Sequence, residues 1–105
     1  MSDDTSDDTT VTVTDNPDEH RFEAHVDGEL AGFAEYSLRE GVIVFTHTEV
    51  DDAYEGRGVG SALARQALDA VRDAGERRVV PRCPFIKAWI DRHPDYRALL
   101  RGPVS

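Results

Sequence analysis

The first half of the chain alternates apolar and polar residues with a period of two, as strands do when they bury one face. This pattern predicts strands at 11–14, 20–26, 29–39 and 42–50. Turn-forming residues separate them: Asp15 to Asp18, the strong hairpin signal Asp27-Gly28, and Glu40-Gly41. Gly32, inside the third run, indicates a bulge. The first half is therefore expected to form an antiparallel meander.

The second half changes to a helical period. Apolar residues three or four positions apart predict a helix over 59–74, which Gly75 ends and on which Arg65 and Asp69 are spaced to pair. A short strand at 77–80 is expected to lie parallel to 42–50 through a right-handed crossover.

Pro84 is expected to begin a second helix that runs to about Arg92, with Cys83 as its cap. His93-Pro94 ends this helix, and 95–100 is expected to form a last helical turn. The predicted fold class is α/β, or mixed α+β: an antiparallel meander, a βαβ unit and a C-terminal helix.

The length and charge distribution predict one small domain with an acidic tail. The chain has 105 residues and a net charge of −9, and residues 1–20 hold seven acids and no Lys or Arg. We expect a disordered tail at 1–9 and one domain at 10–105. The overall charge disfavours nucleic acid. From Gly75 onward, seven Lys or Arg stand against three Asp or Glu, an excess that suits a polyanionic small ligand.

No membrane partner and no metal are expected. The sequence has no apolar run long enough to cross a bilayer, and its first residues lack the basic and apolar parts of a secretory signal. A single cysteine excludes an internal disulfide and fits a cytoplasmic location. His20 and His25 lack the paired spacing of metal ligands. The chain is compatible with a monomer or a homodimer.

A glycine-rich turn between a strand and a helix is the first candidate site. It comprises Glu55, Gly56, Arg57, Gly58, Val59, Gly60 and Ser61. Free N–H groups and the positive end of a helix dipole suit a phosphate or pyrophosphate here, and Arg57 and Ser61 can add side-chain contacts. The alternative is an ordinary turn in which glycines only relieve strain. The spacing matches neither a Walker loop nor a Rossmann fingerprint.

With its flanking motifs, this loop resembles the acetyl-CoA signature of the GCN5-related N-acetyltransferases, and a subgroup of very small members in particular. The resemblance covers about 10–100 and is carried by His47-Thr48-Glu49-Val50, the glycine loop, Val79 to Cys83, and His93-Pro94-Asp95-Tyr96. It implies acetyl-CoA as co-substrate, with its pyrophosphate on the loop. Glu55 stands where the family has Gln or Arg, so binding is expected to rest on backbone N–H groups and Arg57.

Two candidate catalytic residues flank the loop in sequence. Cys83 lies beside Arg82 at a helix start, and both features favour a reactive thiolate. It is either a nucleophile that accepts the acyl group or a buried, inert side chain. Alternation places His47 on one face with Ile43, Phe45 and Glu49, so His47 is either a base for the acceptor amine or a core-edge residue.

The resemblance also implies roles for three further parts of the chain. Tyr96 would donate a proton to the leaving thiolate, or else pack with Trp89 and Phe85. His93 would cap its helix or touch the cofactor. A backbone N–H near Val50 would polarise the acetyl carbonyl, and strands splayed around Glu49 and Arg78 would admit the pantetheine arm.

The leading hypothesis is an acetyl-CoA-dependent N-acetyltransferase that acts on an unidentified amine, by direct attack rather than through Cys83. A second hypothesis is a CoA-binding or interaction module without turnover, since 105 residues leave little chain for an acceptor pocket. A third is a small α+β domain whose loop binds nothing.

Overall fold

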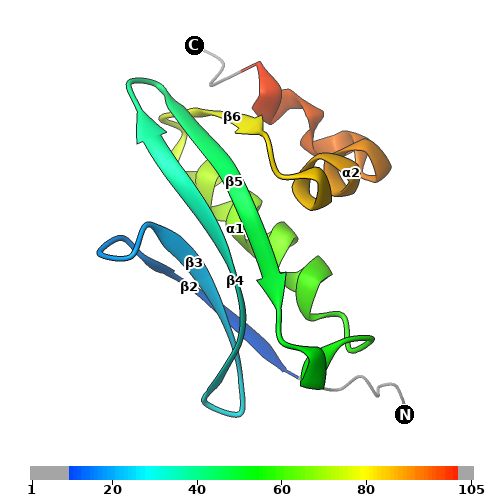
Figure 1. Cartoon of the computed structure of the whole chain (residues 1–105). Helices are drawn as coiled ribbons and strands as arrows, with labels where there is room; N and C mark the ends of the chain where they lie inside the picture. The colour runs from blue at the N-terminus through cyan, green and yellow to red at the C-terminus, as the bar shows by residue number, and fades with distance from the viewer. Residues whose placement is uncertain (1–9, 102–105) are drawn as a thin grey trace.

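The computed structural model describes residues 10–101, which form one curved sheet with two helices (Figure 1). The acidic tail expected at 1–9 lies outside this range. In chain order the elements are β2 (Val11–Asn16), β3 (Arg21–Val26), β4 (Glu29–Arg39), β5 (Val42–Val50), the 3-10 turn η1 (Asp52–Tyr54), α1 (Val59–Ala74), β6 (Arg78–Pro81), α2 (Pro84–Arg92) and the 3-10 segment η2 (Pro94–Leu100).

The sheet has the expected topology. Its order is β2-β3-β4-β5-β6; the first four strands pair antiparallel, and β6 pairs parallel to β5. At the first turn the expectation was wrong: β2 continues to Asn16, and the chain reverses only over 17–20, where His20 has φ +54°. Asp27 and Gly28 both have positive φ, which a tight hairpin turn of the primed types requires.

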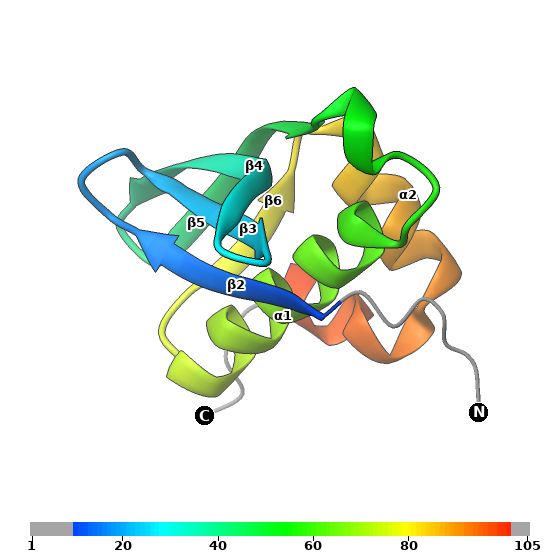
Figure 2. The same cartoon turned by 90° about the horizontal axis from the view of Figure 1, so that it is seen from below.

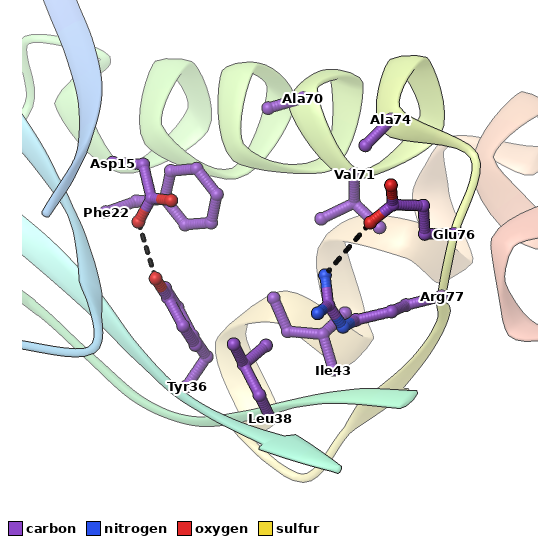
Figure 3. A pocket seen from close by; sticks show the side chains of 10 residues that line it. All are labelled: Asp15, Phe22, Tyr36, Leu38, Ile43, Ala70, Val71, Ala74, Glu76 and Arg77. Carbon is purple, nitrogen blue, oxygen red and sulfur yellow. Dashed lines mark hydrogen bonds and ion pairs between the residues drawn. The ribbon is translucent and has the colours of Figure 1, made fainter. Parts of the chain in front are cut away.

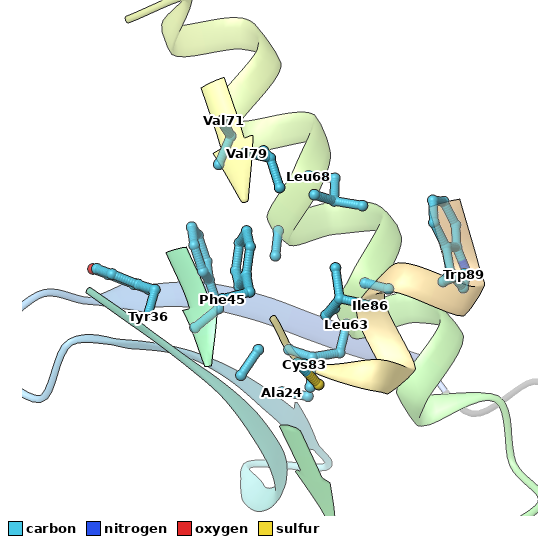
Figure 4. Packing of buried hydrophobic residues seen from close by; sticks show 14 of the residues in the cluster. Ala24, Tyr36, Phe45, Leu63, Leu68, Val71, Val79, Cys83, Ile86 and Trp89 are labelled. Carbon is cyan, nitrogen blue, oxygen red and sulfur yellow. The ribbon is translucent and has the colours of Figure 1, made fainter. Parts of the chain in front are cut away.

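Both helices lie on the same side of the sheet (Figure 2). Their apolar faces form one core with the inward side chains of the strands, and Figure 4 shows Phe45, Leu63, Ile86 and Trp89 in this cluster. Among residues 10–101 no helix covers the opposite side, which we call the outer face. The molecule is therefore two layers thick, with one sheet face open.

Helix α1 has the predicted bounds and is closed at both ends by glycines in the left-handed conformation. Gly58 is the N-cap with φ +78°, and Gly75 is the C-cap with φ +67°. The predicted pairing of Arg65 with Asp69 was wrong, because Asp69 instead binds Arg72 at 2.8 Å, one turn nearer the C-terminus. This ion pair places the guanidinium of Arg72 in the last turn of α1, where the helix dipole favours a positive charge.

A β-bulge in β5 changes which residues share a face. Tyr36 of β4 pairs with Phe45, while the preceding Glu35 pairs with His47, so Thr46 is an extra residue without a partner. The expectation that His47 and Glu49 lie on the same face as Phe45 was therefore wrong. Phe45 points into the core, whereas His47 and Glu49 lie on the outer face and Thr48 points inward.

The second register shift lies next to Gly32. His25 of β3 pairs with Leu30 and Ala24 with Gly32, so the unpaired residue is Ala31 and the bulge is one position from where Gly32 indicated it. Gly32 has a different role: a Cβ there would lie 2.6 Å from the carbonyl oxygen of Glu49. Only glycine lets β4 and β5 approach this closely at that point.

Candidate active site

The pairing between β5 and β6 ends halfway along β5. The last paired residues are Phe45 and Pro81. The backbone N–H groups of Arg82 and Cys83 both donate to the carbonyl of Phe45, at 3.0 and 2.9 Å, and the chain then turns into α2. The 46–50 half of β5 thus has no strand neighbour on this side in the described part of the chain. We call the gap between 46–50 and 82–83 the fork.

The fork begins farther along the strands than expected. Arg78 pairs with Val42 at the closed end, so the opening expected around Glu49 and Arg78 in fact starts after Phe45. In an antiparallel pair, alternate residues direct their N–H groups to opposite sides. Asp51 donates its N–H to Ala31 of β4, at 2.8 Å, and the N–H of Val50 therefore points away from β4, toward the fork.

Cys83 lies at the base of the fork and is buried, with 3% of its surface exposed. Its Sγ lies 3.2 Å from the hydroxyl oxygen of Thr48, across the fork. Cys83 occupies the N-cap position of α2, as expected, although its side chain makes no capping hydrogen bond. The sequence did not indicate Thr48 as a site residue. Strict alternation from Phe45 places its side chain on the outer face, and only the bulge at Thr46 turns it inward.

His47 and Glu49 form an ion-pair geometry on the outer face. The Nε2 of His47 lies 2.9 Å from Oε2 of Glu49, and both side chains are about half exposed or more, at 52% and 62%. The ring of Phe33 lies 6.3 Å from the imidazole. The bulge residue Thr46 separates this pair from the core face, so a base here is reached from the open side of the sheet.

Tyr96 and His93 pack around Trp89 on the helix side. The hydroxyl of Tyr96 donates to Asp69 at 2.8 Å, and its ring meets Trp89 edge-on at 4.8 Å. Burial, and then the bond to Asp69, raise the pKa of Tyr96 above its usual value. His93 stacks on Trp89 at 3.8 Å, and its Nδ1 lies 2.7 Å from the carbonyl oxygen of Trp89. The backbone N–H of His93 caps α2, and the packing of Tyr96 against Trp89 is confirmed.

The glycine loop carries free backbone donors. The first helical hydrogen bond of α1 runs from Ala62 to the carbonyl of Gly58, so the N–H groups at 58–61 have no acceptor within the helix. The N–H of Arg57 is already bound to Tyr54, at 3.3 Å. Gly56 and Gly58 have φ of +80° and +78°, and added Cβ atoms at both would meet open space. This backbone is exposed and can be approached closely.

The third glycine of the loop packs the helices together. A Cβ at Gly60 would lie 2.9 Å from the ring of Phe85, which belongs to the first turn of α2. The Oγ of the adjacent Ser61 accepts the indole N–H of Trp89 at 3.1 Å. Gly60 and Ser61 therefore fasten α1 to α2 through their side-chain positions, while their backbone N–H groups and the hydroxyl proton of Ser61 remain for a ligand.

A small cavity lies at the other end of α1 (Figure 3). It has a volume of about 150 Å³, is lined by residues such as Phe22, Ile43 and Val71, and is bordered by the hydrogen bond from Tyr36 to Asp15. None of the candidate site residues lines it. In residues 10–101 we also find no helix suited to crossing a membrane and no group of three side chains suited to a metal ion.

Comparisons with known proteins concern the family and the fold. Residues 21–99 match the family described as GCN5-related N-acetyl-transferase. Over 53 residues the chain is 40% identical to Protein NATD1 of Bos taurus and 36% identical to that of Homo sapiens, and the match covers 50% of this chain and 46% of each of those proteins. The chain thus matches about half the length of these curated relatives.

Two solved structures share the fold. The ribosomal-protein-S18-alanine N-acetyltransferase of Escherichia coli aligns with a TM-score of 0.55 and 17% identity, over 68% of this chain and 64% of that one. The ribosomal-protein-alanine N-acetyltransferase of Brucella melitensis biovar Abortus 2308 aligns with a TM-score of 0.53 and 22% identity, over 81% of this chain and 61% of that one. At these identities the likeness concerns the fold.

Proposed function

Because the chain belongs to the GCN5-related N-acetyltransferase family, we propose that it transfers an acetyl group from acetyl-CoA to a primary amine. The observation that supports this best is the fork, the unpaired edge of β5 at 46–50. The free backbone donors of the glycine loop follow this edge closely along the chain. A pyrophosphate-binding helix start and an unpaired strand edge together suit a long, partly extended thioester.

The loop residues fit the anionic part of CoA. The N–H groups at 58–61 provide donors at the positive end of α1, and the absence of side chains at Gly56 and Gly58 leaves the backbone open. Arg57, stacked 5.8 Å from the ring of Tyr54, can add a cation. In this proposal Glu55 contributes no favourable contact, since its side chain is exposed and its negative charge would repel a phosphate.

In the proposed reaction the fork supplies an oxyanion donor and a base. The N–H of Val50, directed toward the fork, would stabilise the negative charge that develops on the carbonyl oxygen. His47, held by Glu49, would accept the amine proton from the outer face. Acetyl-CoA supplies a thioester: the amine nitrogen bonds to the acetyl carbon, the carbon–sulfur bond breaks, and its electron pair stays on sulfur.

Cys83 and Tyr96 have subordinate roles in this proposal. Burial of Cys83 and its contact with Thr48 support direct attack by the amine without an acetylated cysteine. A Cys83→Ala variant should therefore keep acetyl transfer; loss of transfer with CoA binding intact would establish the cysteine route. Tyr96 would protonate the leaving thiolate only after giving up its bond to Asp69, so we expect Tyr96→Phe to slow transfer mildly.

Two measurements test the proposed function in sequence. Calorimetry with CoA should show binding, and failure to bind at millimolar concentration would contradict both the enzyme and a CoA-binding module. Release of free thiol from acetyl-CoA across a panel of small amines and peptide amines should then show turnover. Binding without turnover on the whole panel would favour the non-catalytic module.

A further inference from the structure

The outer face of the sheet carries a shallow groove with basic walls. It has a volume of about 580 Å³. We call it the arginine groove; its lining residues come from β4, β5, β6 and the position after β6, and they are Ser37, Arg39, Val42, Val44, Thr46, Arg78, Val80 and Arg82. Three arginines and no acid line it. None of the roles proposed above uses these side chains.

The strand register explains how the groove is built. Val42 on β5 pairs with Arg39 on β4 and with Arg78 on β6, so two basic residues flank one apolar residue. The next row, with Val44 and Val80, continues the apolar floor. Arg82 stands at the end nearest the fork, because its backbone N–H donates to the carbonyl of Phe45. The groove thus leads along β5 toward the fork.

The three arginines have no acidic partner within residues 10–101. Arg21, Arg72 and Arg77 each lie within ion-pair distance of a carboxylate, but no such contact exists for Arg39, Arg78 or Arg82, which are all exposed. The chain as a whole is strongly acidic, with a net charge of −9. Three like charges gathered around one hollow repel one another, and an anionic ligand would relieve that repulsion.

The other end of the outer face has the opposite charge. Glu35 pairs in register with His47, and Phe33 pairs with Glu49. Beyond the bulge at Thr46 the outer face is net acidic, because Glu23, Glu35 and Glu49 outnumber Arg21, which is itself bound to Glu23. Before the bulge lie the three arginines of the groove. A ligand with a cationic amine and an anionic body would be oriented along β5, with its amine at His47.

We infer that the arginine groove holds the anionic part of the acyl acceptor, and that this acceptor is a peptide whose amino terminus is followed by acidic residues. This inference rests on the proposed function. The groove extends from Val42 to Thr46, roughly 13 Å at about 3.3 Å per residue, which is the length of about four extended residues. An open sheet face suits an extended chain, whereas small molecules favour sites that enclose them.

The test compares three peptides of equal length that begin with Ala and continue with acidic, neutral or basic residues. The acidic peptide should have the highest kcat/KM in the wild type. The groove variant carries Arg39→Gln, Arg78→Gln and Arg82→Gln. Its kcat/KM should fall about tenfold for the acidic peptide and stay unchanged for the other two, since each exposed ion pair contributes only modestly. The matched control carries Arg65→Gln, Arg92→Gln and Arg97→Gln, which lie on the helix side. It should leave the ranking of the three peptides by kcat/KM as in the wild type.

Anisotropy with C-terminally labelled peptides gives a readout that does not need turnover. Weaker binding of the acidic peptide by the groove variant, but not by the control, supports the inference even where no thiol is released, and the proposed function alone would then fail. Equal binding of the three peptides by the wild type would overturn the inference and leave acetyl transfer to other amines standing. A loss of CoA affinity in the groove variant would also overturn it, because the groove would then hold the cofactor.

Discussion

The two halves of β5 belong to one strand but differ in strand pairing and in burial. From Val42 to Phe45 the strand is paired on both sides, and Phe45 is fully buried. From His47 to Val50 it is paired on one side only, and His47 is half exposed. The difference shows how a small fold separates tasks: the closed half stabilises the domain, and the open half is free for chemistry.

The largest effect that can test this comparison is on stability in the closed half. Phe45→Ala should lower the free energy of unfolding by about 3–5 kcal/mol, because the ring is buried between the sheet and α1. Urea denaturation followed by circular dichroism measures this loss. His47→Ala in the open half is the control and should stay within about 0.5 kcal/mol of the wild type. A similar loss in both variants would contradict the division.

The second effect concerns activity and reverses the order of these two positions. His47→Ala should reduce kcat/KM for acetyl transfer by about a hundredfold or more, the usual contribution of a general base. Thiol release at saturating acetyl-CoA measures it, and calorimetry should show unchanged CoA affinity. Glu23→Ala, a carboxylate on the same face but two strands away, is the control. Wild-type rates in the histidine variant would remove His47 from the mechanism.

The third effect compares two tyrosines in alkaline solution. Burial and the bond to Asp15 strongly raise the pKa of Tyr36, and burial and the bond to Asp69 raise that of Tyr96. A raised pKa stabilises the folded state below about pH 10, the pKa of an unfolded tyrosine, and this contribution declines as pH rises further. The free energy of unfolding should therefore fall above about pH 10.

Phenylalanine variants assign that alkaline loss to the two ends of the molecule. Tyr36→Phe should flatten the fall more than Tyr96→Phe, because the pKa of Tyr36 is raised more strongly. Denaturation at several pH values between about 9 and 11.5 measures the slope. An unchanged slope in both variants would place the alkaline sensitivity elsewhere.

The smallest effect is expected in the glycine loop. Glu55→Gln should tighten CoA binding by about two- to fivefold, because it removes a negative charge from the positive end of α1. Calorimetry measures it, and Glu76→Gln, beyond the C-terminal end of α1, is the matched control. If Glu55→Gln weakens CoA instead, the side chain of Glu55 helps to hold the cofactor, and the proposal that backbone donors dominate is wrong.

Local patterns predicted the elements well because neighbouring residues determine them. The helical period gave the bounds of α1, Pro84 marked the start of α2, and Asp27-Gly28 marked its hairpin. Side-chain pairing was harder to predict. On α1 both Arg65 and Arg72 are spaced to pair with Asp69, and spacing alone does not decide between them. The second partner of Asp69, Tyr96, comes from η2, which no pattern within α1 reveals.

The candidate site was predicted in its parts but not in its arrangement. The glycine loop, Cys83 and His47 are all near the fork or the start of α1, yet His47 and Thr48 exchanged faces. The cause is one unpaired residue, Thr46, whose effect on side-chain direction is invisible in the sequence of β5 because Thr46 is an ordinary strand former. Likewise, the sequence indicates that Gly60 is a glycine that admits a ligand, whereas the structure shows that it makes room for the ring of Phe85.

Thr46 has a further consequence that concerns contour length rather than side-chain direction. The extra residue makes β5 longer than the stretch of β4 beside it, by roughly 3.3 Å of strand. Because the two strands stay paired although one is longer, the pair bends at the bulge. The pairing of β5 with β6 ends at Phe45, immediately before the extra residue, so the fork opens where the lengths begin to differ.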